Sequence, residues 1–106
     1  MSHLDVLGEI IELNDEGFMV QPEKWTEDVA AQLAREEEGL DTLTENHWKV
    51  IRFIRSYYLE KDLAPMIRLV CRETGLSLKA IYTLFPSGPA KGASKIAGLP
   101  KPDGCV

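Results

Sequence analysis

The stretch after Thr44 constrains the fold most, because its apolar residues recur at helical spacing on two sides. One stripe contains Trp48, Ile51, Ile54 and Tyr58, and the other contains Val50, Phe53 and Tyr57. A helix that is apolar over so wide an arc is buried on more than one side. We therefore expect a long helix starting at Thr44 to be the central element, with Arg52 and Arg55 on its exposed part.

Capping residues predict a shorter helix before the central one. Thr26 is a good side-chain N-cap, and the two acidic residues after it suit the positive end of a helix dipole. We expect this helix to run to about Glu38 and to stop at Gly39, a typical C-cap residue.

Two short helices are predicted after the central one. The first starts near Ala64, with Pro65 in its first turn, where the missing N–H costs nothing, and it ends at Gly75. The second is capped by Ser77 and ends before Pro86. Their tight connection resembles a helix-turn-helix.

A helix-turn-helix raises a DNA-binding regulator as one functional alternative. Its second helix would enter the major groove. That helix has one cation, Lys79, and no Arg, Asn or Gln that could read a base edge. The chain as a whole has a net charge of −5, whereas DNA-binding domains are usually basic. The helical pair is therefore a stronger prediction about structure than about function.

The N-terminal residues predict a small antiparallel hairpin. Apolar stretches at residues 6–13 and 18–20 flank a polar turn at residues 14–17, which ends in glycine. The expected fold class is accordingly α+β and mostly α: a small N-terminal antiparallel hairpin or sheet packed on a bundle of helices.

The chain of 106 residues is long enough for one hydrophobic core. We expect a single domain, residues 1–106, with a globular body at 1–85 and a flexible C-terminal arm at 86–106. Seven glycines and prolines follow Pro86. Only residues 90–97 could hold a helix there, and residues 98–106 are expected to be the freest part of an arm that lies on the body or swings from it.

Composition excludes several classes of protein. No apolar stretch is long enough to span a bilayer, and the N-terminus does not read as a signal peptide. Two cysteines are too few for a disulfide scaffold, so a cytoplasmic location is expected. Residues 1–45 carry 2 basic and 13 acidic side chains, a net −11, and residues 46–106 carry 10 basic and 4 acidic ones, a net +6. The acidic total argues against general nucleic-acid binding and leaves a local basic face possible.

The two cysteines lie in different sequence environments. Cys71 lies inside a predicted helix and is expected to be a small core residue with a slowly reacting thiol. Cys105 is the penultimate residue and follows Gly104, in a segment with little to pack against. An exposed thiol of this kind favours a functional role as a nucleophile. The arm has no histidine to act as a base, so the base would come from a partner protein.

The sequence gives little support for a metal site or a phosphate-binding loop. His3, His47, Cys71 and Cys105 lack a metal-ligand spacing, and no glycine-rich phosphate loop is present. We therefore predict no metal and no cofactor. A redox protein that pairs Cys71 with Cys105 remains an alternative.

Residues 84–106, with the sequence LFPSGPAKGASKIAGLPKPDGCV, resemble the C-terminal arm of the DsrC/TusE family almost residue for residue. This family contains sulfur carriers similar to the gamma subunit of sulfite reductase. Residues 45–60 and 65–68 also look like the central helices of the family. Gly17, Phe18 and Trp25 match its N-terminal hairpin and helix entry.

The resemblance implies a helical body with a small sheet and an arm whose penultimate cysteine carries sulfur as a persulfide, a role that falls on Cys105. Two-cysteine members have a second arm cysteine eleven residues earlier, where this chain has Ser94. Without that thiol the arm cannot close an internal disulfide or form the trisulfide of dissimilatory sulfite reduction. The resemblance is thus to the single-cysteine TusE branch of transfer-RNA thiolation, a sulfurtransferase-type covalent carrier. The alternative is a DsrC-type protein in which Ser94, native or engineered, replaces the second cysteine.

The resemblance also implies partners, namely donor and acceptor proteins of a DsrEFH/TusBCD-like sulfur relay, or sulfite reductase. The link at residues 73–77 is a tight turn, whereas the family carries a longer charged loop that is associated with partner docking. Basic side chains could stabilise the anionic persulfide or dock an acidic partner: Arg52, Arg55, Arg68, Arg72, Lys91, Lys95 and Lys101.

Overall fold

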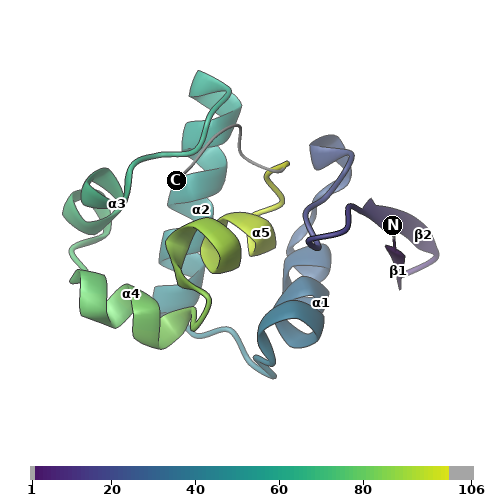
Figure 1. The fold of residues 1–106 in the computed structure, drawn as a ribbon, viewed down its shortest axis with the longest axis horizontal. Coiled ribbons are helices and arrows are strands. Elements are labelled where there is room, and N and C mark those ends of the chain that lie inside the picture. The colour runs from purple at the N-terminus through teal and green to yellow at the C-terminus, as the bar shows by residue number, and fades with distance from the viewer. Residues whose placement is uncertain (1, 101–106) are drawn as a thin grey trace.

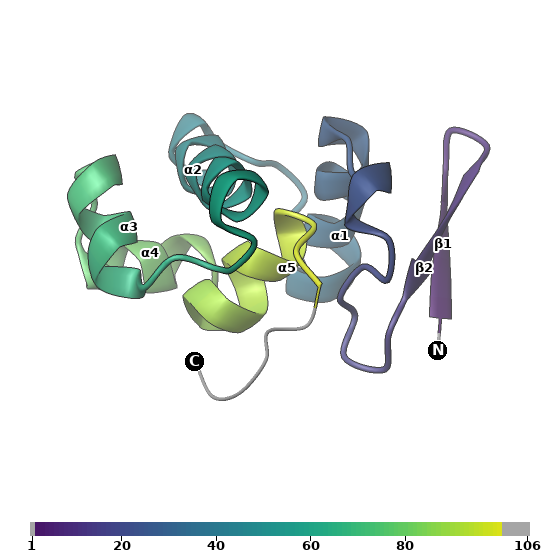
Figure 2. The same ribbon diagram turned by 90° about the horizontal axis from the view of Figure 1, so that it is seen from above.

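The computed structural model describes residues 2–100 and shows a mostly helical fold with one two-stranded antiparallel sheet (Figure 1). This confirms the predicted fold class. In chain order the elements are β1 (Ser2–Val6), β2 (Glu9–Leu13), η1 (Pro22–Lys24), α1 (Glu27–Glu38), α2 (Glu45–Lys61), α3 (Ile67–Thr74), α4 (Leu78–Leu84), η2 (Pro89–Ala93) and α5 (Ser94–Ile96). The hairpin lies at one end of the molecule, α3 and α4 lie at the other, and α5 lies between them (Figures 1 and 2).

Helix α2 is the central element, as its two apolar stripes predict. Val50, Ile51 and Ile54 are almost completely buried. The helix packs against α3 on one side and against η2 and α5 on another. The core of the protein forms around it.

Side-chain caps start three of the helices, each at the predicted residue. Thr26 accepts a hydrogen bond from the backbone N–H of Val29 at α1, and Ser77 accepts one from Ala80 at α4. At α2, Thr44 and His47 form a reciprocal capping box.

The start of α3 differs from the prediction. The helix begins at Ile67, not near Ala64, and Met66 is its N-cap, with extended backbone angles (φ −68°, ψ 146°). Steric contact with the proline ring disfavours helical angles at the residue before a proline, here Ala64. Pro65 is buried outside the helix and does not occupy its first turn. The predicted end at Gly75 is correct, because Gly75 takes left-handed angles there.

The turn of the hairpin differs from the predicted turn. β1 and β2 pair from Ser2 opposite Leu13 to Val6 opposite Glu9, so the two-residue turn is Leu7-Gly8, inside the predicted strand 6–13 and near its start. Both turn residues have positive φ, as a type I′ hairpin turn requires. The turn predicted at residues 14–17 does form, but beyond it there is only an isolated bridge between Leu13 and Met19.

The described part of the predicted arm, residues 86–100, is packed against the body. Ala93, Ile96, Ala97 and Leu99 belong to one core cluster with side chains of α1 and α2. Residues 93, 96 and 97 follow the i, i+3, i+4 spacing of a helix face, which explains their burial despite the glycine-rich and proline-rich sequence. The helix expected within 90–97 forms as η2, a π-helical turn that runs into α5. The freedom expected from residue 98 onward is wrong for Gly98 and Leu99, which are buried.

No helix in residues 2–100 is long and apolar enough to cross a membrane.

Candidate functional site

The predicted reactive residue, Cys105, lies outside the described residues, as does Lys101. What the structure describes is the root of the segment that carries Cys105, at residues 94–100. The candidate site is therefore built from the contacts of this root.

The root leaves α5 through a Schellman motif. The N–H of Leu99 donates to the carbonyl of Ser94 (3.1 Å), and the N–H of Gly98 donates to the carbonyl of Lys95 (3.0 Å). Gly98 has the left-handed φ of +78° that this motif needs. The motif satisfies two of the last carbonyls of the helix and leaves the next three to find other partners.

Two side chains from distant parts of the chain bind those three carbonyls. The indole Nε1–H of Trp25 donates to the carbonyl of Ile96 (2.8 Å). One guanidinium nitrogen of Arg55 donates to the carbonyls of Ala97 and Gly98 (3.3 Å each), and another donates to Pro22 (2.8 Å). We call this pair, Trp25 and Arg55, the root clamp.

The two members of the root clamp also stack on each other. The Arg55 guanidinium carbon lies 4.8 Å from the centre of the Trp25 ring, within cation–π range. Burial lowers the pKa of the Arg55 side chain, and its interaction with Tyr58 opposes that shift. The expectation that Arg55 lies on the exposed part of α2 is therefore wrong. Its guanidinium binds backbone carbonyls of the arm, a contact that the periodicity of α2 does not reveal.

A second set of contacts attaches the arm to the C-terminal turn of α1. Glu38 accepts hydrogen bonds from the backbone N–H and the hydroxyl of Ser87, at 3.0 and 2.6 Å. The neighbouring Glu37 pairs with Lys95 at 3.4 Å, and the Lys95 ammonium lies 5.4 Å from the centre of the Phe18 ring. Of the predicted basic candidates, Lys95 is thus engaged in holding the arm.

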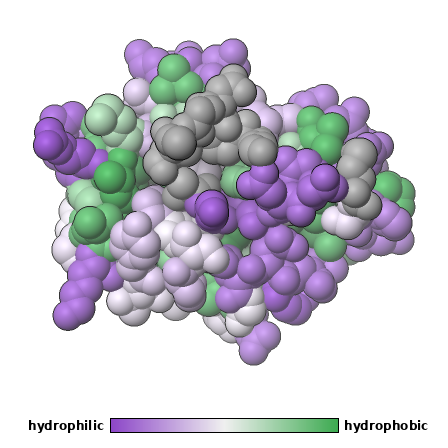
Figure 3. Space-filling model, in the orientation of Figure 1, coloured by the Kyte–Doolittle hydropathy of each residue, from purple (hydrophilic) through white to green (hydrophobic). Residues whose placement is uncertain are grey.

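Ser94, the residue at the family's second cysteine position, is 4% exposed and lines a cavity of about 360 Å³. The cavity lies between the arm, α3 and α4, and Met66, Leu78 and Tyr82 give it an apolar rim. These three side chains are about half exposed or more. On the face shown in Figure 3, hydrophobic side chains reach the surface beside α3.

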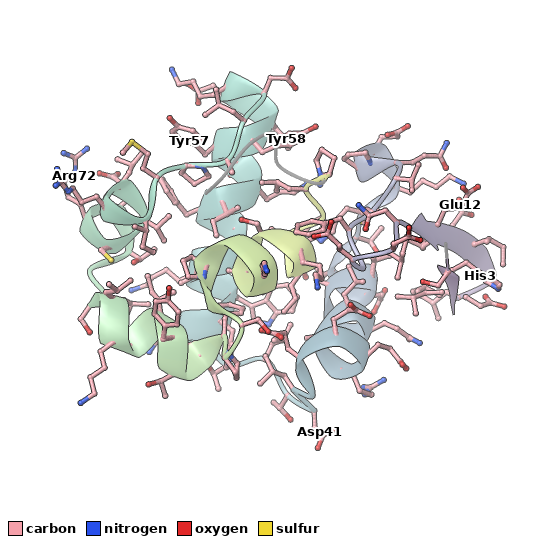
Figure 4. The ribbon with its side chains drawn as sticks, viewed as in Figure 1. His3, Glu12, Asp41, Tyr57, Tyr58 and Arg72 are labelled. Atoms are coloured by element: carbon pink, nitrogen blue, oxygen red, sulfur yellow. The ribbon has the colours of Figure 1, made fainter. Side chains whose placement is uncertain are left out.

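The remaining basic candidates are dispersed. Arg52 is exposed, pairs with Glu27 at 3.0 Å and lies over the ring of Trp48. Arg72 points outward from α3 (Figure 4) and lies 3.6 Å from Glu73. Arg68 is also exposed, and Lys91 is exposed at the edge of the cavity. Among these basic residues, Arg55 binds the arm from the body, and Lys95, which belongs to the arm, binds Glu37 of the body.

The other thiol, Cys71, is free and partly buried, and it packs against the core cluster. His47 is a structural residue: its Nδ1 accepts from the backbone N–H of Thr44, so its Nε2–H donates to the carbonyl of Leu84. Within residues 2–100 no group of three or more His, Cys, Asp or Glu side chains could hold a metal ion.

The helix-turn-helix-like pair forms as predicted, with α3 and α4 joined through Gly75. Ile81 of α4 faces the core, whereas Leu78 and Tyr82 line the cavity beside the arm. The outward surface of α4 near these residues is therefore apolar, which is unlike a helix that reads DNA.

Sequence reasoning missed the roles of Trp25, Glu37 and Glu38 in holding the arm. Trp25 matches the family pattern at the helix entry, and that match was the only available signal. The two glutamates belong to an acidic run that looks like a solvated helix end, so nothing local distinguishes them.

Comparisons with known proteins identify the class. The family model described as "DsrC like protein" matches residues 5–106, so this chain belongs to the DsrC-like family.

Individual relatives agree with that assignment. The chain is 41% identical over 106 residues to the dissimilatory-type sulfite reductase subunit gamma of Nitratidesulfovibrio vulgaris, with 100% of both chains covered. It is 46% identical over 107 residues to the sulfurtransferase TusE of Photorhabdus laumondii, with 93% of this chain and 94% of the relative covered. The crystal structure of the oxidized gamma subunit of dissimilatory sulfite reductase (DsrC) from Archaeoglobus fulgidus matches with a TM-score of 0.89 and 42% identity, covering 99% of this chain and 100% of that one.

Proposed function

We propose that this protein is a sulfur-relay carrier that accepts sulfur on Cys105 as a persulfide and passes it to an acceptor. The position of Cys105 carries the proposal. It lies six positions beyond Leu99, the last fully buried residue that the structure describes. Cys71 is a poorer candidate, because it is partly buried and packs on the core.

The transfer needs no net oxidation. The Cys105 thiolate attacks the outer sulfur of a donor persulfide, a new S–S bond forms on Cys105, and the donor's own sulfur leaves as a thiolate. A thiolate of the acceptor then attacks the outer sulfur of the Cys105 persulfide and regenerates Cys105. Exchange of this kind requires an accessible nucleophile more than a preformed pocket. A base, if needed, would come from the partner.

Among the relay pathways, Ser94 favours the single-cysteine, TusE-like role in transfer-RNA thiolation. A buried hydroxyl at that position cannot form a disulfide or a trisulfide with Cys105. We propose donor and acceptor proteins of a DsrEFH/TusBCD-like relay, or sulfite reductase, as partners, and the cytoplasm as the site of action. The relatives' names favour this role over DNA regulation.

Intact mass spectrometry tests the proposal. Wild-type protein incubated with inorganic polysulfide should gain about 32 Da per transferred sulfur, and dithiothreitol should remove the gain. Cys105→Ser should lose the adduct, whereas Cys71→Ser, the matched control with the same chemical change, should keep it. An equal adduct on Cys105→Ser and on wild type would refute the assignment to Cys105.

A further inference from the structure

We propose that Trp25 and Arg55 are positioning residues for sulfur transfer: they fix the root of the segment that carries Cys105, so that Cys105 follows a fixed Leu99 by six positions. The inference rests on the proposed function of Cys105. It adds two residues that act through the backbone of residues 96–98.

The geometry of the root clamp supports this role. The carbonyls of Ile96, Ala97 and Gly98 are consecutive, and each accepts a hydrogen bond from a clamp side chain. Arg55 also binds the carbonyl of Pro22, so the same guanidinium ties the root to the segment before α1. Trp25 is separated from Ile96 by 71 residues, which means that the clamp joins the first quarter of the chain to its end.

The root and the clamp also fit each other sterically. The Trp25 ring lies so close to Gly98 that an added Cβ would overlap its Cδ1 atom. The Arg55 guanidinium carbon lies 4.8 Å from the centre of the same ring. The backbone and two side chains are therefore held in one arrangement, at the point where the described chain ends.

A fixed root matters because the local concentration of a tethered group falls with roughly the −3/2 power of the tether length. With the root held up to Leu99, the tether to Cys105 is residues 100–105, or six residues. If the root opened through α5, the tether would be residues 94–105, and the local concentration of Cys105 near the root would fall by about three-fold. Opening through η2 as well would give about a five-fold fall.

The chain contains a matched control for both clamp residues. Trp48 and Arg52 form a second tryptophan–arginine stack, at 5.5 Å, on the same helix α2. Arg52 bonds to Glu27, and no hydrogen bond described for this second pair reaches the arm. Trp48→Phe and Arg52→Met therefore make the same chemical changes as Trp25→Phe and Arg55→Met without touching the root.

The experiment measures the effective concentration of Cys105 beside the root. Ser56, exposed on α2 next to Arg55, is changed to cysteine in a Cys71→Ser background, so that the full-length chain has two thiols. Equilibration with glutathione disulfide closes a bond between Cys105 and the new cysteine and releases two glutathione molecules. The equilibrium constant is the effective concentration, and thermal unfolding of every variant is measured in parallel.

We expect Trp25→Phe and Arg55→Met to lower the effective concentration by about three- to five-fold, with Arg55→Lys in between, and the control pair to leave it unchanged. Equal values in all variants, after correction for any unfolded fraction, would overturn the proposal, since a purely structural role changes only stability. If Arg55→Met does not fold, Trp25→Phe and Arg55→Lys decide the question.

Sulfur uptake separates this inference from the proposed function. The rate of polysulfide uptake on Cys105, measured in proteins without the reporter cysteine, should be the same in clamp and control variants, because a small donor does not need a fixed placement of the thiol relative to the root. No uptake in wild type would refute the sulfur-carrier proposal. Uptake together with equal effective concentrations would refute the clamp alone.

Discussion

At Gly98 the backbone meets two independent constraints. Its φ of +78° is a left-handed conformation that side-chain-bearing residues adopt at an energetic cost, and the Trp25 ring occupies the space that a Cβ would need. Gly39, at the end of α1, has a similar φ of +69° but no atom within 4 Å of an added Cβ. A comparison of the two glycines therefore separates the cost of the left-handed backbone conformation from the cost of steric overlap with a neighbouring side chain.

We predict that Gly98→Ala lowers the free energy of unfolding more than Gly39→Ala does. The left-handed conformation alone should cost about 1 kcal/mol at either position. At residue 98 the ring of Trp25 must also move, which should bring the total to about 2–3 kcal/mol. Urea denaturation of both variants measures the difference, and equal losses would contradict the close packing of Trp25 against the root.

At the scale of elements, one capping box connects two helices. Thr44 and His47 exchange hydrogen bonds at the start of α2, and the other ring nitrogen of His47 donates to Leu84, the last residue of α4. The His47 ring also meets the Phe85 ring edge-on, with centroids 5.1 Å apart. The N-terminus of the central helix and the C-terminal end of α4 are therefore fixed together.

Removing the cap should weaken this junction. We predict that Thr44→Ala lowers the free energy of unfolding by about 1 kcal/mol, because a backbone N–H of the first turn loses its side-chain partner. Thr42→Ala is the control, since Thr42 is exposed in the loop before the cap. Chemical denaturation compares the two, and a loss for Thr42→Ala as large as that for Thr44→Ala would argue against the cap.

At the scale of the whole molecule, the arm up to Leu99 is part of the hydrophobic core. Ile96 is completely buried, and α5 packs on both α1 and α2. The body is therefore not a complete globule that merely carries an arm. Its core is closed by the segment that leads to Cys105, which couples the stability of the fold to the placement of that segment.

We predict that Ile96→Ala lowers the free energy of unfolding by about 2–4 kcal/mol, as expected for a fully buried isoleucine. Ile10→Ala makes the same change at a side chain that is 48% exposed and should cost about 1 kcal/mol or less. Thermal and urea unfolding measure both. A small effect at residue 96 would show that the arm adds little to the core.

The sequence by itself determined the local features and the family. Thr26, Thr44 and Ser77 start helices and Gly39 and Gly75 end them, because a cap acts within one helical turn of its own position. The arm motif indicated the family and pointed to Cys105, whose role remains a prediction outside the described residues. The turn at Leu7-Gly8 could also have been predicted, since the glycine that permits it is visible in the sequence.

Only the tertiary structure decided how the arm is held. The root clamp joins residues that are 42 to 71 positions apart, and Glu38 reaches Ser87 across 49 positions. Periodicity placed Arg55 on the exposed side of α2, and glycine and proline content predicted a loose arm. Both signals are local, whereas the burial of Ile96 and Leu99 and the capture of three carbonyls depend on which distant surfaces meet when the chain folds.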